Sequence, residues 1–309
     1  MHPPKREHTF FGMMATPFTE DDRIDEPALR LHLRRMVAAG IGVYMGAGGA
    51  GEGHTMTADE LSQVFHIGVE ECKGKVPVYA TIPETRTGAA TVERCRLAAA
   101  AGVDAIQVFF PDGGHGMRPR PNEQARFYRD LLSKVQYPLA ISAHQHSGFL
   151  PKVKLLKALC DDHPQVVAIN AMVTPMAYIV ELMDTLGGGM KVYTSVRDLV
   201  SGLVLGANGC LAAEPNVIPN MCMRVLRAFE AGNLPAMGEA FGHLTRFDEV
   251  VNRWAPSTAR WVKMAMKALE LPGSGGPIRE PYVLPPKEEM DEMKREFERL
   301  GIRKLEGLG

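Results

Sequence analysis

Eight short runs of apolar and β-branched residues recur along the chain, with amphipathic segments between them. The runs predict strands at Phe11–Thr16, Gly42–Gly46, Pro77–Ile82, Ala105–Phe110, Leu139–Ala143, Val166–Asn170, Lys191–Ser195 and Gly209–Ala213. The clearest amphipathic segments predict helices at Glu26–Ala39, Asp59–Cys72, Thr91–Ala101, Asn122–Lys134 and Lys152–Cys160. Eight strands that alternate with helices favour an α/β protein built as a closed (β/α)8 TIM barrel over an open doubly wound sheet.

The last third of the chain has a different pattern, with helices and no further strand. The helices are expected at Ile218–Ala231, Pro235–Asn252, Thr258–Leu269 and Lys287–Leu300, and a Gly- and Pro-rich connection, Pro272–Pro286, precedes the last one. We therefore expect residues 1–217 to form the barrel and residues 218–309 to form a C-terminal helical extension packed on it.

Charge and composition exclude several classes of partner. The 309 residues include 35 Lys and Arg against 36 Asp and Glu, so no global field would hold a nucleic acid or an acidic membrane. The five cysteines form no CxxC pair, which argues against a disulfide framework. No apolar run approaches the roughly 20 residues of a membrane span, and the first residues lack the apolar core of a signal peptide. A cytoplasmic protein without a nucleic-acid or membrane partner is expected.

The polar residues that follow each strand are the candidate functional groups, because barrels of this kind place their chemistry at the carboxyl ends of the strands. Side chains two residues apart on a strand share a face. This alternation predicts that Ser142, His144 and His146 point to the barrel axis from the fifth strand. Asn170 and Glu214 have the corresponding position on the sixth and eighth strands.

Two histidines on one inner face are the sharpest signal, because imidazole titrates near neutrality and can carry protons or bind a metal. An inward Glu214 is a candidate general base. Glu52 has two equal interpretations, a functional carboxylate or an acceptor of backbone N–H groups that shapes its loop. Arg197 either pairs locally with Asp198 or clamps an anionic substrate.

A metal site is a weaker hypothesis. His144, His146 and Glu214 are ligand types that suit a divalent metal such as zinc. The spacing supplies only two adjacent donors, however, so no cofactor is the main expectation.

Several motifs resemble the dihydrodipicolinate synthase / N-acetylneuraminate lyase superfamily. They are Ala15-Thr16-Pro17-Phe18, Gly48-Gly49-Ala50-Gly51-Glu52, the strand that follows Pro138, and Ala255-Pro-Ser-Thr leading into Trp261–Leu269 with Gly276-Pro-Ile-Arg279 after it. The resemblance implies a (β/α)8 barrel with a C-terminal helical bundle, assembled as a homodimer or homotetramer. It also implies that Gly49, Ala50 and Ser142 occupy substrate-binding positions. Thr16, in the motif that follows the first strand, is a further predicted substrate-binding residue.

The catalytic groups of that family are not preserved. The family forms a Schiff base with a 2-oxo acid through a lysine that ends the sixth strand, and the matching residue is Asn170. An amide nitrogen is not basic and cannot form an imine. Gly49 and Ala50 replace a threonine pair that holds the substrate carboxylate, and Ser142 replaces a tyrosine that relays protons.

These features predict a divergent family member: a lyase, either an aldolase or a hydro-lyase, that acts on a small oxygenated organic acid or carbonyl compound without a Schiff base. The predicted catalytic residues are His144, His146, Asn170, Glu214 and Glu52, and the predicted substrate-binding residues are Thr16, Gly49, Ala50, Ser142 and Arg197. One alternative is a divalent-metal-dependent hydrolase or aldolase that uses the two histidines. Another is a non-catalytic barrel that binds a small molecule.

Overall fold

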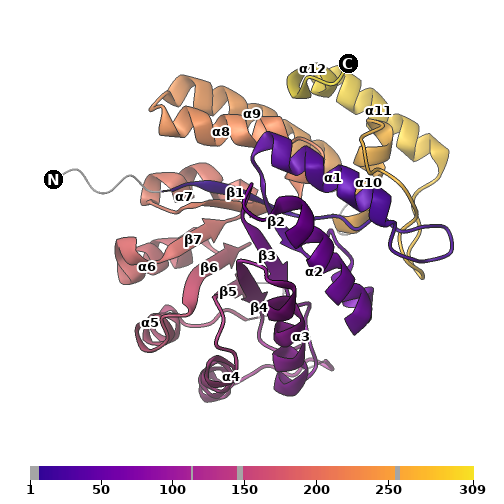
Figure 1. Cartoon of the computed structure of the whole chain (residues 1–309). Coiled ribbons are helices and arrows are strands. Elements are labelled where there is room, and N and C mark those ends of the chain that lie inside the picture. Colours follow the sequence, from indigo (N-terminus) through magenta and orange to yellow (C-terminus); the bar gives the residue numbers. More distant parts are fainter. Residues whose placement is uncertain (1–6, 113, 145–148, 255–257) are drawn as a thin grey trace. The chain divides into compact units, whose positions relative to one another are not determined.

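Eight parallel strands close into a barrel in chain order in the computed structural model, which describes residues 7–112, 114–144, 149–254 and 258–309 (Figure 1). The strands are β1 (Thr9–Met13), β2 (Gly42–Met45), β3 (Val78–Thr81), β4 (Ala105–Val108), β5 (Leu139–His144), β6 (Val166–Met172), β7 (Lys191–Thr194) and β8 (Gly209–Ala212). Each one overlaps a predicted run, so the TIM barrel is confirmed.

Helices follow the strands as expected. Those of the barrel are α1 (Glu26–Ala39), α2 (Ala58–Cys72), α3 (Gly88–Ala101), α4 (Pro121–Lys134), α5 (Val153–Asp162), α6 (Met176–Leu186) and α7 (Leu199–Leu205). After β8 come α8 (Pro219–Glu230), α9 (Leu234–Val251), α10 (Thr258–Ala268), α11 (Lys287–Leu300) and α12 (Ile302–Glu306), which confirms the C-terminal helices.

Local capping explains where the first helix begins and ends. The side chain of Asp25 accepts a hydrogen bond from the backbone N–H of Ala28 at 3.0 Å, and Gly40 ends the helix with a φ of 82°. A short acceptor before the first turn and a glycine after the last one are the usual helix boundaries. These residues fix α1 at its predicted bounds.

The contacts divide the chain into two compact units. One contains the residues up to Thr9 together with Tyr79–Leu211, and the other contains Phe10–Val78 together with Ala212–Gly309. The expected boundary after residue 217 lies inside the second unit and stays a prediction.

The first unit has its most extensive strand pairing between β5 and β6, where Ser142 lies opposite Asn170 and His144 opposite Met172. Helices α3 to α7 lie on the outer side of strands β4 to β7 (Figure 1). Gly209, with a φ of 133°, begins β8, and a Cβ atom there would lie 2.0 Å from the carbonyl oxygen of Thr9. Only glycine permits this approach.

The second unit is anchored around a buried asparagine, Asn216. Its Oδ1 accepts a hydrogen bond from the backbone N–H of Ala15 at 2.9 Å, and its Nδ2 donates to the carbonyl of Met13 at 2.8 Å. His32 Nε2 lies 2.8 Å from the same Oδ1, and burial lowers the pKa of His32 to about 3, so the ring is neutral and donates. Helices α8 and α9 run side by side in this unit (Figure 1).

Among the described residues, every helix is too short or too polar to cross a lipid bilayer.

Candidate active site

Strands β5 and β6 bring three of the predicted site residues together. Lateral neighbours in a parallel sheet point to the same side, so the register places Ser142 and Asn170 on one face, with His144 one step further along. Asn170 is fully buried and His144 is half-buried. The ring of His144 lies 6.4 Å from that of Phe109, which follows β4. His146 lies outside the described residues.

Two hydroxyl groups near these residues lack hydrogen-bond partners within the part of the chain that the structure describes. Ser142 is 4% exposed and Thr174, two residues after the end of β6, is 7% exposed. A buried hydroxyl without a partner costs about 1–3 kcal/mol. Such groups in native proteins are rare enough to require an explanation, and a bound ligand is one.

Val173 lies between β6 and Thr174 and adopts a φ of 51°. A β-branched residue is a genuine outlier in the left-handed region, and the conformation costs about 1–3 kcal/mol. The Val173 side chain is 40% exposed, so its burial offsets little of this cost. Backbone strain of this kind concentrates at functional sites.

The glycine loop, Gly46–Gly53, follows β2 in the other unit. A Cβ atom on Gly51 would lie 2.6 Å from the carbonyl oxygen of Met14 and 2.8 Å from that of Ala47, so glycine is required there. Glu52 ends the tight part of the loop with a φ of 55°. Its carboxylate is buried and forms an ion pair with Lys263 of α10. Its other oxygen accepts a hydrogen bond from the backbone N–H of Arg279 at 2.9 Å.

Lys263 and Arg279 both lie against the ring of Phe18. The Lys263 ammonium is 4.5 Å from the ring centroid and donates to the carbonyl of Pro277 at 2.7 Å. The Arg279 guanidinium is 4.2 Å from the same centroid and pairs with Glu60 and Asp22. Burial lowers the pKa of Lys263, and the ion pair with Glu52 opposes this shift.

This network engages both oxygens of Glu52, which favours the loop-shaping interpretation of that residue. Its catalytic role stays a prediction. Sequence reasoning did not single out Lys263, although a signal existed: it is one charged residue among Trp261, Val262, Met264, Ala265 and Met266.

Glu214 does not lie on β8 as the alternation assumed. The strand ends at Ala212, Ala213 has helical dihedral angles, and Glu214 begins a short 3₁₀ turn. Burial and then the neighbouring carboxylate of Asp248 on α9 raise the pKa of Glu214 to about 8. A carboxyl group that stays protonated at neutral pH is suited to donate a proton, so the predicted role as a base has less support than before.

The remaining predicted residues lie in three segments of the chain. Thr16 and Ala50 are buried, and Gly49 is exposed, where a Cβ atom would lie 3.5 Å from Thr258. Arg197 is exposed in the turn Val196–Asp198. Within the described ranges, no group of three His, Cys, Asp or Glu side chains could hold a metal ion. The metal hypothesis involves His146 and therefore stays a prediction.

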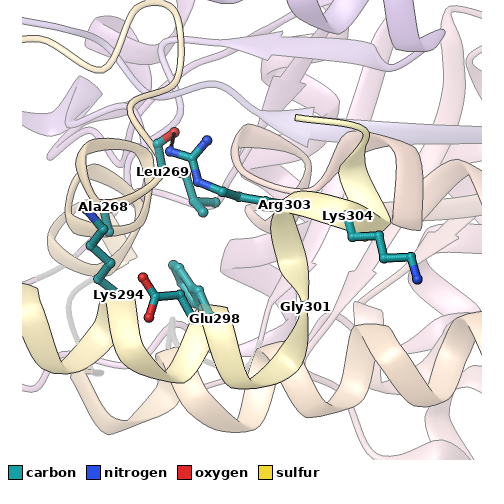
Figure 2. Close-up of a pocket in the computed structure, with 8 residues that line it drawn as sticks. Ala268, Leu269, Lys294, Glu298, Gly301, Arg303 and Lys304 are labelled. Carbon is teal, nitrogen blue, oxygen red and sulfur yellow. Dashed lines mark hydrogen bonds between the residues drawn. The ribbon is translucent and has the colours of Figure 1, made fainter. Parts of the chain in front are cut away.

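A cavity of about 260 Å³ lies among α10, α11 and α12 (Figure 2), and none of the predicted site residues lines it. Leu269 and Phe297 contribute apolar surface to it. Figure 2 shows Arg303 reaching toward Leu269, whose carbonyl accepts a hydrogen bond from the guanidinium at 3.2 Å. Because its walls are mainly apolar and this guanidinium already has partners, the cavity offers little for catalysis.

Comparison with known proteins identifies the family. The profile of the dihydrodipicolinate synthetase family matches residues 7–300. The chain belongs to this family. A 4-hydroxy-tetrahydrodipicolinate synthase of Maridesulfovibrio salexigens is 26% identical over 226 residues, which cover 72% of this chain and 76% of that protein. Membership supports an activity of lyase type.

Solved structures agree with the fold. A prophage protein of the dihydrodipicolinic acid synthase family from E. coli K12, in complex with pyruvate, superposes with a TM-score of 0.87 at 18% identity, covering 96% of this chain and 99% of that one. The N-acetylneuraminate lyase of Proteus mirabilis gives a TM-score of 0.84 at 17% identity, covering 96% and 100%. At these identities the likeness concerns the fold alone.

Proposed function

We propose that this family member is a lyase, an aldolase or a hydro-lyase, that acts on a small oxygenated organic acid or carbonyl compound without a Schiff base. Asn170 carries the proposal. It is fully buried on β6, and the sequence motifs match it to the lysine of the family. An amide donates and accepts hydrogen bonds but cannot attack a carbonyl to form an imine.

The chemistry starts from a C–H bond beside a carbonyl group. Removal of that proton leaves an enolate, whose negative oxygen is stabilised by hydrogen bonds that the protein holds ready. Asn170 donates one through its amide, and the hydroxyl of Ser142, beside it in register, donates a second. His144 takes the proton and returns it to the product or leaving group.

The other predicted residues complete this proposal. His146 shares the proton transfer, Glu214 or Glu52 orients a histidine or exchanges a proton, and Thr16, Gly49, Ala50 and Arg197 contact the substrate. The protein works as a homodimer or homotetramer and needs no cofactor.

Two measurements on pyruvate test the absence of a Schiff base. Borohydride treatment with pyruvate should leave no added mass on the protein, as read by intact mass spectrometry. Exchange of the C3 protons of pyruvate or 2-oxobutyrate in D₂O, followed by NMR, should still be catalysed. Asn170→Lys is a useful comparison because it restores the amine. A covalent adduct on the wild-type protein would overturn the proposal and return the chain to the chemistry of its relatives.

The same samples test the two alternatives. Elemental mass spectrometry before and after a chelator should find no stoichiometric metal; metal that is lost in His144→Ala would favour the metal-dependent enzyme. A carbonyl compound that raises the melting temperature but shows no exchange or turnover would favour the non-catalytic binding protein.

A further inference from the structure

The segment that follows β6 holds a residue that the proposed mechanism does not use. Thr174 is more than nine-tenths buried, and its hydroxyl has no hydrogen-bond partner among the described residues. It lies one residue before the N-cap position of α6, which Pro175 occupies, and no side chain caps this helix. A helix-capping role therefore does not account for this hydroxyl.

Several buried hydroxyls of the same unit have partners. Thr81 donates to Gln107 at 3.0 Å, Thr85 and Thr91 lie 2.6 Å apart, and Ser195 donates to Asp198 at 2.7 Å. Among the described residues of this unit, the exceptions are the hydroxyls of Tyr128 on α4, Ser142 and Thr174, and the last two lie on neighbouring strands or just beyond them. Because buried polar groups are normally satisfied, a shared reason is more economical than two separate defects.

The spacing of these two residues says what could satisfy both. Ser142 lies level with Asn170, and Thr174 is four residues further along the chain. An extended chain rises roughly 3.3 Å per residue, so the two hydroxyls are separated by at most about 13 Å along the strand direction. A molecule longer than a three-carbon acid, with oxygen atoms at both ends, suits a separation of up to this length.

The residue directly before Thr174, Val173, has an unusual left-handed backbone conformation. A residue at this position with a negative φ would continue the strand and turn the following side chain differently. With the left-handed conformation at Val173, the next residue, Thr174, is buried. Strain that persists next to an unsatisfied donor is typical of a ligand clamp.

We propose that Thr174 is a specificity-determining residue, which binds an oxygen atom at the far end of a substrate whose 2-oxo or carboxyl end lies at Ser142 and Asn170. The substrate class is an organic acid longer than three carbons with a second oxygen-bearing group. This inference rests on the proposed function only in placing the substrate at the carboxyl ends of β5 and β6.

Calorimetric titration with pyruvate and with 2-oxoglutarate tests the proposal. The second acid keeps the 2-oxo end and adds a distant carboxylate. Wild-type protein should bind 2-oxoglutarate more tightly than pyruvate. Thr174→Val keeps the shape and removes the donor, so it should weaken 2-oxoglutarate binding roughly tenfold to a hundredfold and leave pyruvate binding unchanged. Thr174→Ser should retain the preference.

Thr85→Val is the matched control, because it removes a buried hydroxyl that already has a partner. It should lower the melting temperature without changing either affinity. Thr174→Val should weaken 2-oxoglutarate binding without lowering the melting temperature. Wild-type protein that does not prefer 2-oxoglutarate, or Thr174→Val protein that keeps the preference, would overturn the inference. A borohydride-trapped pyruvate adduct would defeat the proposed function while leaving these affinity ratios interpretable.

Discussion

The glycine loop and the end of β6, one in each compact unit, differ in whether their buried polar groups have interaction partners. At the glycine loop the carboxylate of Glu52 is matched by Lys263 and by the backbone of Arg279. At the end of β6 the hydroxyl of Thr174 has no partner in the described chain, and Val173 beside it is strained. A satisfied charge stabilises its surroundings, whereas an unsatisfied donor is free to bind something else.

This difference changes how a polar residue at a strand end is interpreted. Glu52 and Thr174 both follow strands and are both buried, so their positions alone make them equally good candidates for a functional role. Their partners separate them: Glu52 has a counter-charge in Lys263 and a backbone donor in Arg279, and the hydroxyl of Thr174 has no partner among the residues described. This contrast favours Thr174 over Glu52 as a residue that binds substrate.

The largest expected effect concerns His144 on β5, in the same compact unit as the end of β6. Replacing a group that transfers protons lowers kcat by ~10²–10⁴. His144→Ala should show this loss in the C3 exchange assay, with little change in melting temperature because the ring is only half-buried. Exchange at the wild-type rate would remove His144 from the mechanism.

Replacing Lys263 tests the ion pair that holds Glu52 at the glycine loop. Lys263→Met leaves the buried carboxylate of Glu52 without its counter-charge, and breaking a buried pair costs about 3–5 kcal/mol. Urea unfolding should show this loss of stability. Lys267→Met, on the same helix but less buried, is the control and should change little. The double variant Lys263→Met with Glu52→Gln should recover part of the loss, and a fully stable Lys263→Met protein would contradict the role given to the network.

The raised pKa of Glu214, in the same compact unit as the glycine loop, predicts an unusual pH dependence of the free energy of unfolding. This pKa, about 8, keeps the carboxyl group protonated in the folded protein, whereas it ionises near pH 4.5 in the unfolded chain. The folded state therefore holds an extra proton between these pH values, and this contribution to stability is complete below pH 4.5 and is lost as the pH rises toward 8. Glu214→Gln should flatten that decline in urea titrations, and identical pH profiles would refute the assignment.

Ser142 gives the smallest effect on stability. Its hydroxyl has no partner to lose within the described structure, so Ser142→Ala should leave the free energy of unfolding within about 1 kcal/mol of the wild type or raise it. The same change should reduce the C3 exchange rate. A clear loss of stability would mean that the hydroxyl is satisfied after all, and the contrast with the glycine loop would weaken.

Local sequence signals were sufficient for most of the fold. The predicted helices Glu26–Ala39 and Lys287–Leu300 match α1 and α11 at both ends, because capping residues and apolar periodicity act within a few residues. The predicted end of the sixth strand was two residues short. Strand β6 continues to Met172 because Met172 pairs with His144 of β5, and a pairing partner is invisible to local pattern.

The candidate site could be predicted only in part for the same reason. Alternation correctly placed Ser142 and Asn170 on one face, since the strand is regular there. It failed at Glu214, where the chain leaves the strand one residue earlier and the carboxyl group meets Asp248 instead. Thr174 carried no signal at all, because a threonine before a proline and a helix resembles an ordinary cap.

The sequence by itself determined the alternation of strands and helices and the helical C-terminal region, because these depend on residue type and near-neighbour spacing. The tertiary structure decided which buried groups find partners. Lys263 pairs with Glu52, which lies more than 200 residues away in the chain, and the hydroxyl of Thr174 has no hydrogen-bond partner among the described residues. That distinction, between polar groups that hold the protein together and groups left open for a substrate, exists only after the chain has folded.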